Sequence, residues 1–164
     1  MSLLFAYASN MNVEEFVKTV PSAKKVSIAR LPGYTFTFSL TAKDQSSKAN
    51  ITSSAAPDAE VWGVLIRFDE HELGNFFNAS TWSSDFNLID VNCLDPQGDL
   101  HKAKAFSAKP HAVNDFLLPY DWYLAKIVKL ARASGLPENY IAGIERVDTK
   151  PDPDEKRRAR KAGK

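Results

Sequence analysis

The pattern of apolar and polar residues at the N-terminus predicts a buried strand that leads into a helix. Residues 3–8 are almost entirely apolar, Ser9-Asn10 follows, and apolar side chains then recur at helical spacing from Val13 to Val20. Such a junction directs backbone N–H groups and the positive end of a helix dipole toward one point. Residues 3–10 are therefore a candidate anion site, although many proteins begin in this way and bind nothing there.

The next part of the chain carries two strand patterns. Residues 34–40 alternate apolar and polar side chains without interruption, which predicts a half-buried strand. Residues 61–66 are a nearly continuous apolar run that fits a central strand, and Gly63 permits another segment to approach its backbone closely. Between these strands, residues 41–60 have the composition of a long polar loop that contains a short strand at 49–52.

The second half of the chain predicts helices and one hairpin. A capped helix is expected at residues 69–78, and two strands at 86–93 and 101–108 would pair across a turn. One further helix should stop at Gly135, and the next should begin at Pro137.

Most of the predicted strands are neighbours that could pair as hairpins, and strands and helices do not alternate regularly. This order favours an α+β fold with a small, mostly antiparallel sheet or barrel. We expect one domain over residues 1–150. Residues 151–164 are basic and offer no apolar partner around Lys156, which predicts a solvated, disordered tail.

Composition narrows the classes of protein that the chain can represent. The 164 residues are 44% hydrophobic and 25% charged, which fits one globular domain, and the net charge of +1 gives no general attraction to nucleic acid. The single cysteine, Cys93, excludes an internal disulfide, and no residues have the spacing of metal ligands. The N-terminal apolar run is too short for a signal sequence or a membrane span. We expect a cytoplasmic protein without a cofactor, a membrane anchor or a nucleic-acid partner.

The residues alone supply no catalytic assignment, because no nucleophile–base pair, phosphate loop or metal motif is present. Cys93 is interpreted as a small buried hydrophobic residue rather than a reactive thiol. The histidines are interpreted as surface residues and the tryptophans as core residues: His71, His101, His111, Trp62, Trp82 and Trp122.

Four short motifs, in matching order and at compatible spacing, resemble those of the gamma-glutamylcyclotransferase family. Tyr7-Ala8-Ser9-Asn10 is similar to the Tyr-Gly-Ser-Asn loop that opens this family. The similarity continues through residues 29–34, residues 58–64, and Tyr123 together with residues 135–140. It covers nearly the whole chain up to Val147.

The resemblance implies a cyclotransferase-type β-barrel of about six strands, flanked by helices, over residues 1–150. It also implies a small-molecule ligand and a monomer or homodimer. In the family, backbone amides of the opening loop hold the α-amino and carboxylate end of a γ-glutamyl group. Carried over to this chain, the ligand-binding residues are Tyr7, Ala8, Ser9, Asn10 and Tyr123.

The family reaction is an intramolecular aminolysis that releases 5-oxoproline, with one Glu as general base and then general acid. An ungapped count from residues 61–63 places Ser80 where the family has this Glu, and a serine without a paired base cannot shuttle the proton. Asp85 is a nearby carboxylate that could substitute for it, whereas Glu72 is explained by helix capping. Ala8 also replaces the loop glycine, which matters if that position requires a positive φ.

Two hypotheses follow from these departures. In the first, the chain is a pseudoenzyme that binds a small γ-glutamyl compound or a related amide or carboxylate without converting it. In the second, it is an active cyclotransferase that uses Asp85 or another displaced acid. A minor third hypothesis is an interaction module that binds through the basic tail at residues 151–164.

Overall fold

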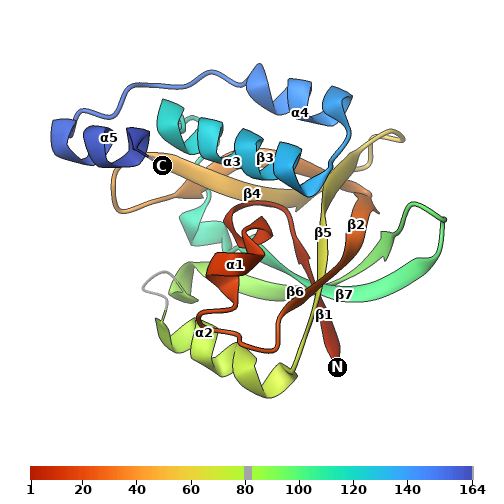
Figure 1. The fold of residues 1–164 in the computed structure, drawn as a ribbon. Helices are drawn as coiled ribbons and strands as arrows, with labels where there is room; N and C mark the ends of the chain where they lie inside the picture. Colours follow the sequence, from red (N-terminus) through yellow and green to blue (C-terminus); the bar gives the residue numbers. More distant parts are fainter. Residues whose placement is uncertain (80–82, 164) are drawn as a thin grey trace.

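Five strands close into a barrel in the order β1, β5, β2, β6, β7 (Figure 1). The computed structural model describes residues 1–79 and 83–163. The barrel strands are β1 (Ser2–Ala6), β2 (Lys24–Pro32), β5 (Glu60–Phe68), β6 (Phe86–Leu94) and β7 (Leu100–Ala108). Neighbouring barrel strands are antiparallel except at the closure, where Leu4 of β1 pairs in parallel with Lys104 of β7.

The expected central strand, β5, lies between β1 and β2, and its apolar run is buried. Gly63 is required there because β1 lies close against it. A Cβ atom at Gly63 would lie 2.5 Å from the carbonyl oxygen of Ala6 and 2.9 Å from the ring of Phe5. The close approach predicted from the sequence is therefore confirmed, and it involves Ala6, the last residue of β1.

A second, two-stranded sheet consists of β3 (Tyr34–Thr41) and β4 (Ser47–Ser53). A buried amide joins this sheet to the barrel, because the Oδ1 atom of Asn50 accepts a hydrogen bond from the backbone N–H of Ala108 at 2.9 Å. The short strand expected at residues 49–52 is present as β4, but it is longer than predicted, so only the residues on either side of it belong to the predicted long loop. The buried side chains of β4 include the polar residues Ser47 and Asn50, so the hydrophobic alternation typical of a strand is missing.

Five α-helices are present among the described residues: α1 (Val13–Phe16), α2 (Leu73–Ala79), α3 (Asp121–Ser134), α4 (Glu138–Glu145) and α5 (Glu155–Ala162). Short 3-10 helices occur at Ser9–Met11, Glu70–Glu72, Ser83–Asp85 and Pro110–Ala112. In Figure 1, α3 lies across the β3–β4 sheet with α4 and α5 beside it. The α3 helix ends at Gly135 in a left-handed conformation (φ 86°), as predicted. None of the helices in the described part of the chain has the length and apolar character needed to span a bilayer.

The α+β class and a closed barrel flanked by helices are confirmed, with two differences in detail. The barrel contains five strands rather than about six, because β3 and β4 form a separate sheet. Its closing pair is parallel, so the sheet is mixed. The alternation within each strand cannot reveal either feature, because it reports which face is buried and not which strand is the neighbour.

The C-terminal segment is not disordered as the sequence predicted. Residues 155–162 form α5, and Asp152 just before it is fully buried and bonded to Arg157. The guanidinium of Arg157 also lies 5.4 Å from the ring centre of Tyr120. Ion pairs and cation–π contacts thus order this segment, and a hydrophobicity pattern does not register them.

Candidate functional site

A cavity of about 520 Å³ lies between the end of β1, the β3–β4 connection and α3. All five ligand-binding residues suggested by the family resemblance line it: Tyr7, Ala8, Ser9, Asn10 and Tyr123. The sequence places Tyr123 more than a hundred residues from the loop. The structure therefore brings the suggested residues together in one place, while their role toward a ligand stays a prediction.

The loop after β1 presents polar groups to this cavity. Ser9 and Asn10 lie in a single 3-10 turn, and Met11 and Asn12 donate their backbone N–H groups back to Ala8 and Ser9. Within the described part of the chain, the N–H groups of Ser9 and Asn10 donate to no backbone carbonyl. Backbone N–H groups at the start of such a turn are donors that an anionic group can accept.

Ala8 adopts φ −142°, which lies outside the left-handed region. The replacement of the family glycine therefore does not place an alanine at a positive φ.

Tyr7 has a structural hydrogen bond. Its hydroxyl donates to the carbonyl oxygen of Phe106 on β7 at 2.6 Å, and the side chain is buried. Burial, followed by the neighbouring phenols of Tyr123 and Tyr140, raises the pKa of Tyr7, so the phenol stays neutral. Tyr7 thus contributes an aromatic wall to the cavity and joins β1 to β7.

Tyr123 connects the loop to the second sheet. Its phenolic oxygen accepts a hydrogen bond from the backbone N–H of Ala49 at 3.1 Å and also interacts with the Ser9 side chain. Burial raises the pKa of Tyr123, while these two hydrogen bonds act in the opposite direction. The buried phenol therefore positions Ser9 at the cavity wall.

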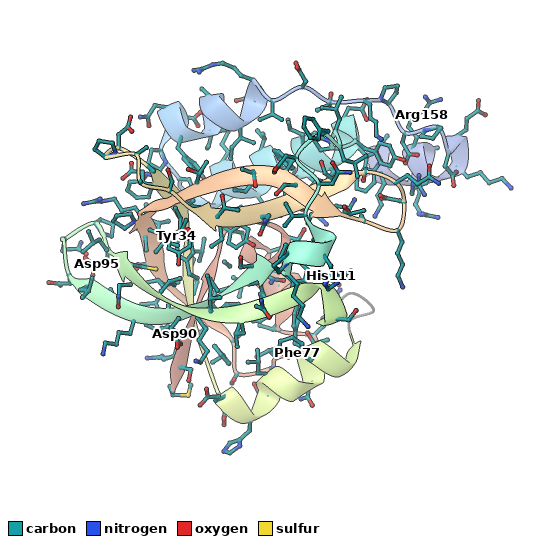
Figure 2. All side chains as sticks on the ribbon, turned by 180° about the vertical axis from the view of Figure 1, so that it is seen from behind. Tyr34, Phe77, Asp90, Asp95, His111 and Arg158 are labelled. Carbon is teal, nitrogen blue, oxygen red and sulfur yellow. The ribbon has the colours of Figure 1, made fainter. Side chains whose placement is uncertain are left out.

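Asp85 is the carboxylate that the sequence suggested as a substitute acid, and it lines the same cavity. It ends the 3-10 helix before β6, and its backbone carbonyl accepts a hydrogen bond from the N–H of Lys109 at 2.7 Å. One carboxylate oxygen lies 3.2 Å from Nε2 of His111. Figure 2 shows His111 at the open end of the β6–β7 hairpin, away from the turn at Asp95. Ser80, at the expected position of the family Glu, lies outside the described residues.

Lysines form much of the remaining rim, and reasoning from the sequence missed them. Lys43, Lys48, Lys126 and Lys161 all line the cavity, against two carboxylates, Asp44 and Asp85, among its described lining residues. The sequence offers no signal for this cluster, since these lysines belong to separate segments.

Lys48 is partly buried within this rim. Its ammonium lies 3.1 Å from a carboxylate oxygen of Asp44 and 4.4 Å from the ring centre of Tyr123. Burial lowers the pKa of Lys48, and Asp44 counteracts this effect.

Trp122 also lines the cavity and is half-buried, so its interpretation as a core residue is corrected. Trp82 lies outside the described residues.

The three histidines and the cysteine lie outside the cavity lining. His71 and His111 are exposed, whereas His101 is half-buried and bonded to Asp95 at 2.8 Å. Cys93 is fully buried, as predicted, and burial raises its thiol pKa to about 12. Across residues 1–79 and 83–163, no three His, Cys, Asp or Glu side chains are arranged to hold a metal ion.

Comparison with solved structures places this fold among gamma-glutamyl cyclotransferases. A structure described as a gamma-glutamyl cyclotransferase has a TM-score of 0.82 at 22% identity and covers 99% of both chains. An uncharacterized protein from Homo sapiens has a TM-score of 0.79 at 24% identity, over 91% of this chain and 89% of its own. A yeast gamma-glutamyl cyclotransferase specific to glutathione has a TM-score of 0.62 at 11% identity, over 87% and 93%. At these identities the likeness establishes the fold.

No family model and no curated protein sequence matches the chain.

Proposed function

We propose that this protein binds a small γ-glutamyl compound, or a related amide or carboxylate, in the cavity beside β1. The observation that carries this proposal is the convergence of residues 7–10 and Tyr123 on one cavity in a cyclotransferase-type fold. The N–H groups of Ser9 and Asn10 would hold the carboxylate of the γ-glutamyl end, with Tyr7 and Tyr123 as a neutral wall.

A second candidate function is catalysis, and the position of Asp85 in the same cavity favours it. In this reaction the α-amine of the ligand attacks its own γ-carbonyl carbon, and a new C–N bond closes the ring. Asp85 would accept the proton from the attacking amine and return it to the departing nitrogen as the original amide bond breaks. The products are 5-oxoproline and the amine or amino acid formerly attached.

Calorimetric titration with γ-glutamylglycine tests binding. The wild-type protein should bind it, and Ser9→Pro, which removes one loop N–H donor, should weaken binding at least about fivefold. A matched change in an exposed turn, Gln97→Pro, removes an N–H outside the cavity and should leave binding intact. Equal affinity of the Ser9→Pro variant would overturn the placement of the ligand at this loop.

Release of 5-oxoproline from a panel of γ-glutamyl amines and dipeptides separates the two candidate functions. Turnover that Asp85→Asn abolishes establishes the enzyme and contradicts the pseudoenzyme. Binding without turnover, together with turnover gained in Ser80→Glu, establishes the binding protein that has lost its acid.

We also propose a cytoplasmic protein that acts as a monomer or homodimer. The one cysteine is buried and free, in keeping with a reducing compartment. Cell fractionation and light scattering test the two parts of this proposal.

A further inference from the structure

The C-terminal helix α5 is held against the rim of the cavity by a buried carboxylate. Asp152 is 0% exposed and accepts two hydrogen bonds from Arg157, from Nε and Nη2, each at 2.6 Å. It also accepts one from the indole N–H of Trp122 on α3 at 2.9 Å. Because Trp122 lines the cavity, this contact fixes the position of α5 relative to the site.

This arrangement brings a lysine from the C-terminal helix into the cavity wall. The ammonium of Lys161 lies 4.8 Å from the ring centre of Trp122, and that of Lys48 from β4 lies 4.5 Å from the same indole. Both lysines line the cavity. Two segments that are far apart in the sequence thus place positive charge around one aromatic residue.

Lys161 adds to the positive charge around Lys48. After burial, which is the main cause, the charges of Lys161 and Arg157 also disfavour the charged form of Lys48, against the stabilising effect of Asp44. Both lysines line the cavity, so a negative group bound there would offset this effect. Tyr123 connects this part of the wall to the opening loop, since its ring lies 4.4 Å from Lys48 while its hydroxyl interacts with Ser9.

We propose that α5 is a specificity element of this cavity, and that Lys161 and Lys48 select ligands with a negative charge on the part beyond the γ-amide. This inference rests on the proposed γ-glutamyl site. The loop at residues 7–10 holds the γ-glutamyl end, and the two lysines hold a carboxylate on the attached group. A γ-glutamyl amino acid or peptide is then preferred over a γ-glutamyl amine or amide.

The test compares two ligands that differ by one charge: γ-glutamylglycine, which has a free terminal carboxylate, and γ-glutamylglycinamide, which does not. Calorimetric titration of the full chain should show that the carboxylate form binds about fivefold more tightly at low salt, the value of a modest ion pair. Lys161→Gln should reduce this preference to about twofold or less, and Lys161→Arg should restore it.

Lys156→Gln is the matched control, because Lys156 is an exposed lysine on the same helix outside the cavity lining. It should retain the preference of the wild-type protein. Circular dichroism of each variant verifies that α5 and the fold are intact.

The outcomes separate this inference from the proposed function. If the wild-type protein binds both ligands equally well, or if Lys156→Gln lowers the preference as much as Lys161→Gln, the role of Lys161 is overturned while the γ-glutamyl site stands. If neither ligand binds, the proposed function itself fails.

Discussion

The phenolic oxygen of Tyr123 accepts a hydrogen bond from the backbone N–H of Ala49 at 3.1 Å, and this contact joins α3 to β4 at the cavity wall. Ala49 pairs with Phe38 where the register of the β3–β4 sheet shifts, between Phe38 and Leu40. The irregularity in the sheet and the buried phenol therefore coincide, and the same side chain that lines the cavity also satisfies a backbone donor.

Tyr123→Phe should lower the free energy of unfolding by about 1–2 kcal/mol, because the buried N–H of Ala49 loses its acceptor. It should also weaken binding of γ-glutamylglycine, because Ser9 loses its contact with the phenol. Urea unfolding and calorimetric titration measure the two effects. Tyr34→Phe, on β3 outside the cavity lining, is the control and should change stability by less than about 0.5 kcal/mol. Unchanged stability in Tyr123→Phe would show that this hydrogen bond is dispensable.

Gly63→Ala should destabilise the protein by about 1–3 kcal/mol, because the added methyl group meets backbone atoms of β1 that cannot move aside independently. Gly74 in α2 is the matched control, since a Cβ there meets no atom within 4 Å. Gly74→Ala should stabilise the protein by up to about 1 kcal/mol through its higher helix propensity. Thermal and urea unfolding of both variants test the contrast, and a similar sign for the two substitutions would contradict the packing at Gly63.

The elements that the sequence predicted well have a local signature. The apolar run around Gly63 identified the central strand β5, and the turn between residues 86–93 and 101–108 identified the hairpin of β6 and β7. Gly135 ended α3 where predicted. In each of these cases the burial pattern or the turn chemistry is written within a few consecutive residues.

The elements that the sequence missed or predicted only in part depend on contacts between distant segments. Strand β4, predicted only as a short strand at residues 49–52, buries polar side chains such as Asn50, whose partners lie on β3 and β7. Helix α5 is ordered by Asp152 and Trp122, which lie outside the helix. Its own charged composition, considered alone, therefore suggested disorder. For the same reason the sequence placed the tail outside the site, whereas Lys161 lines the cavity. Family resemblance supplied the suggestion of Tyr123, because no local pattern distinguishes it from a core tyrosine.

Cys93 should be almost inert toward thiol reagents in the native protein. It is fully buried, and its pKa of about 12 leaves very little thiolate near neutral pH. We expect labelling by a chromogenic disulfide at about pH 8 to be at least about a hundredfold slower in the native protein than in urea. Rapid native labelling would contradict the buried position of the thiol on β6.

Asp152 should make the stability of the protein sensitive to acid. Hydrogen bonds from Arg157 are the main cause that holds its pKa well below the usual range, so its folded-state pKa lies below the unfolded value. Its ionised form therefore stabilises the folded state fully above the unfolded pKa of about 4, and this contribution is lost as pH falls from there through the folded pKa. Asp152→Asn should accordingly be less stable than the wild-type protein near neutral pH, by an amount that shrinks below about pH 4.

Urea unfolding from about pH 7 down to about pH 2.5 measures this difference in stability. Asp58→Asn, an exposed carboxylate on the connection before β5, is the control and should stay within about 0.5 kcal/mol of the wild-type protein. A difference for Asp152→Asn that is constant down to the lowest pH, or that grows on acidification, would contradict the ionised Asp152–Arg157 pair. Since that pair anchors α5, the same variant should lose part of the preference for γ-glutamylglycine over its amide near neutral pH, where Asp152 of the wild-type protein is ionised.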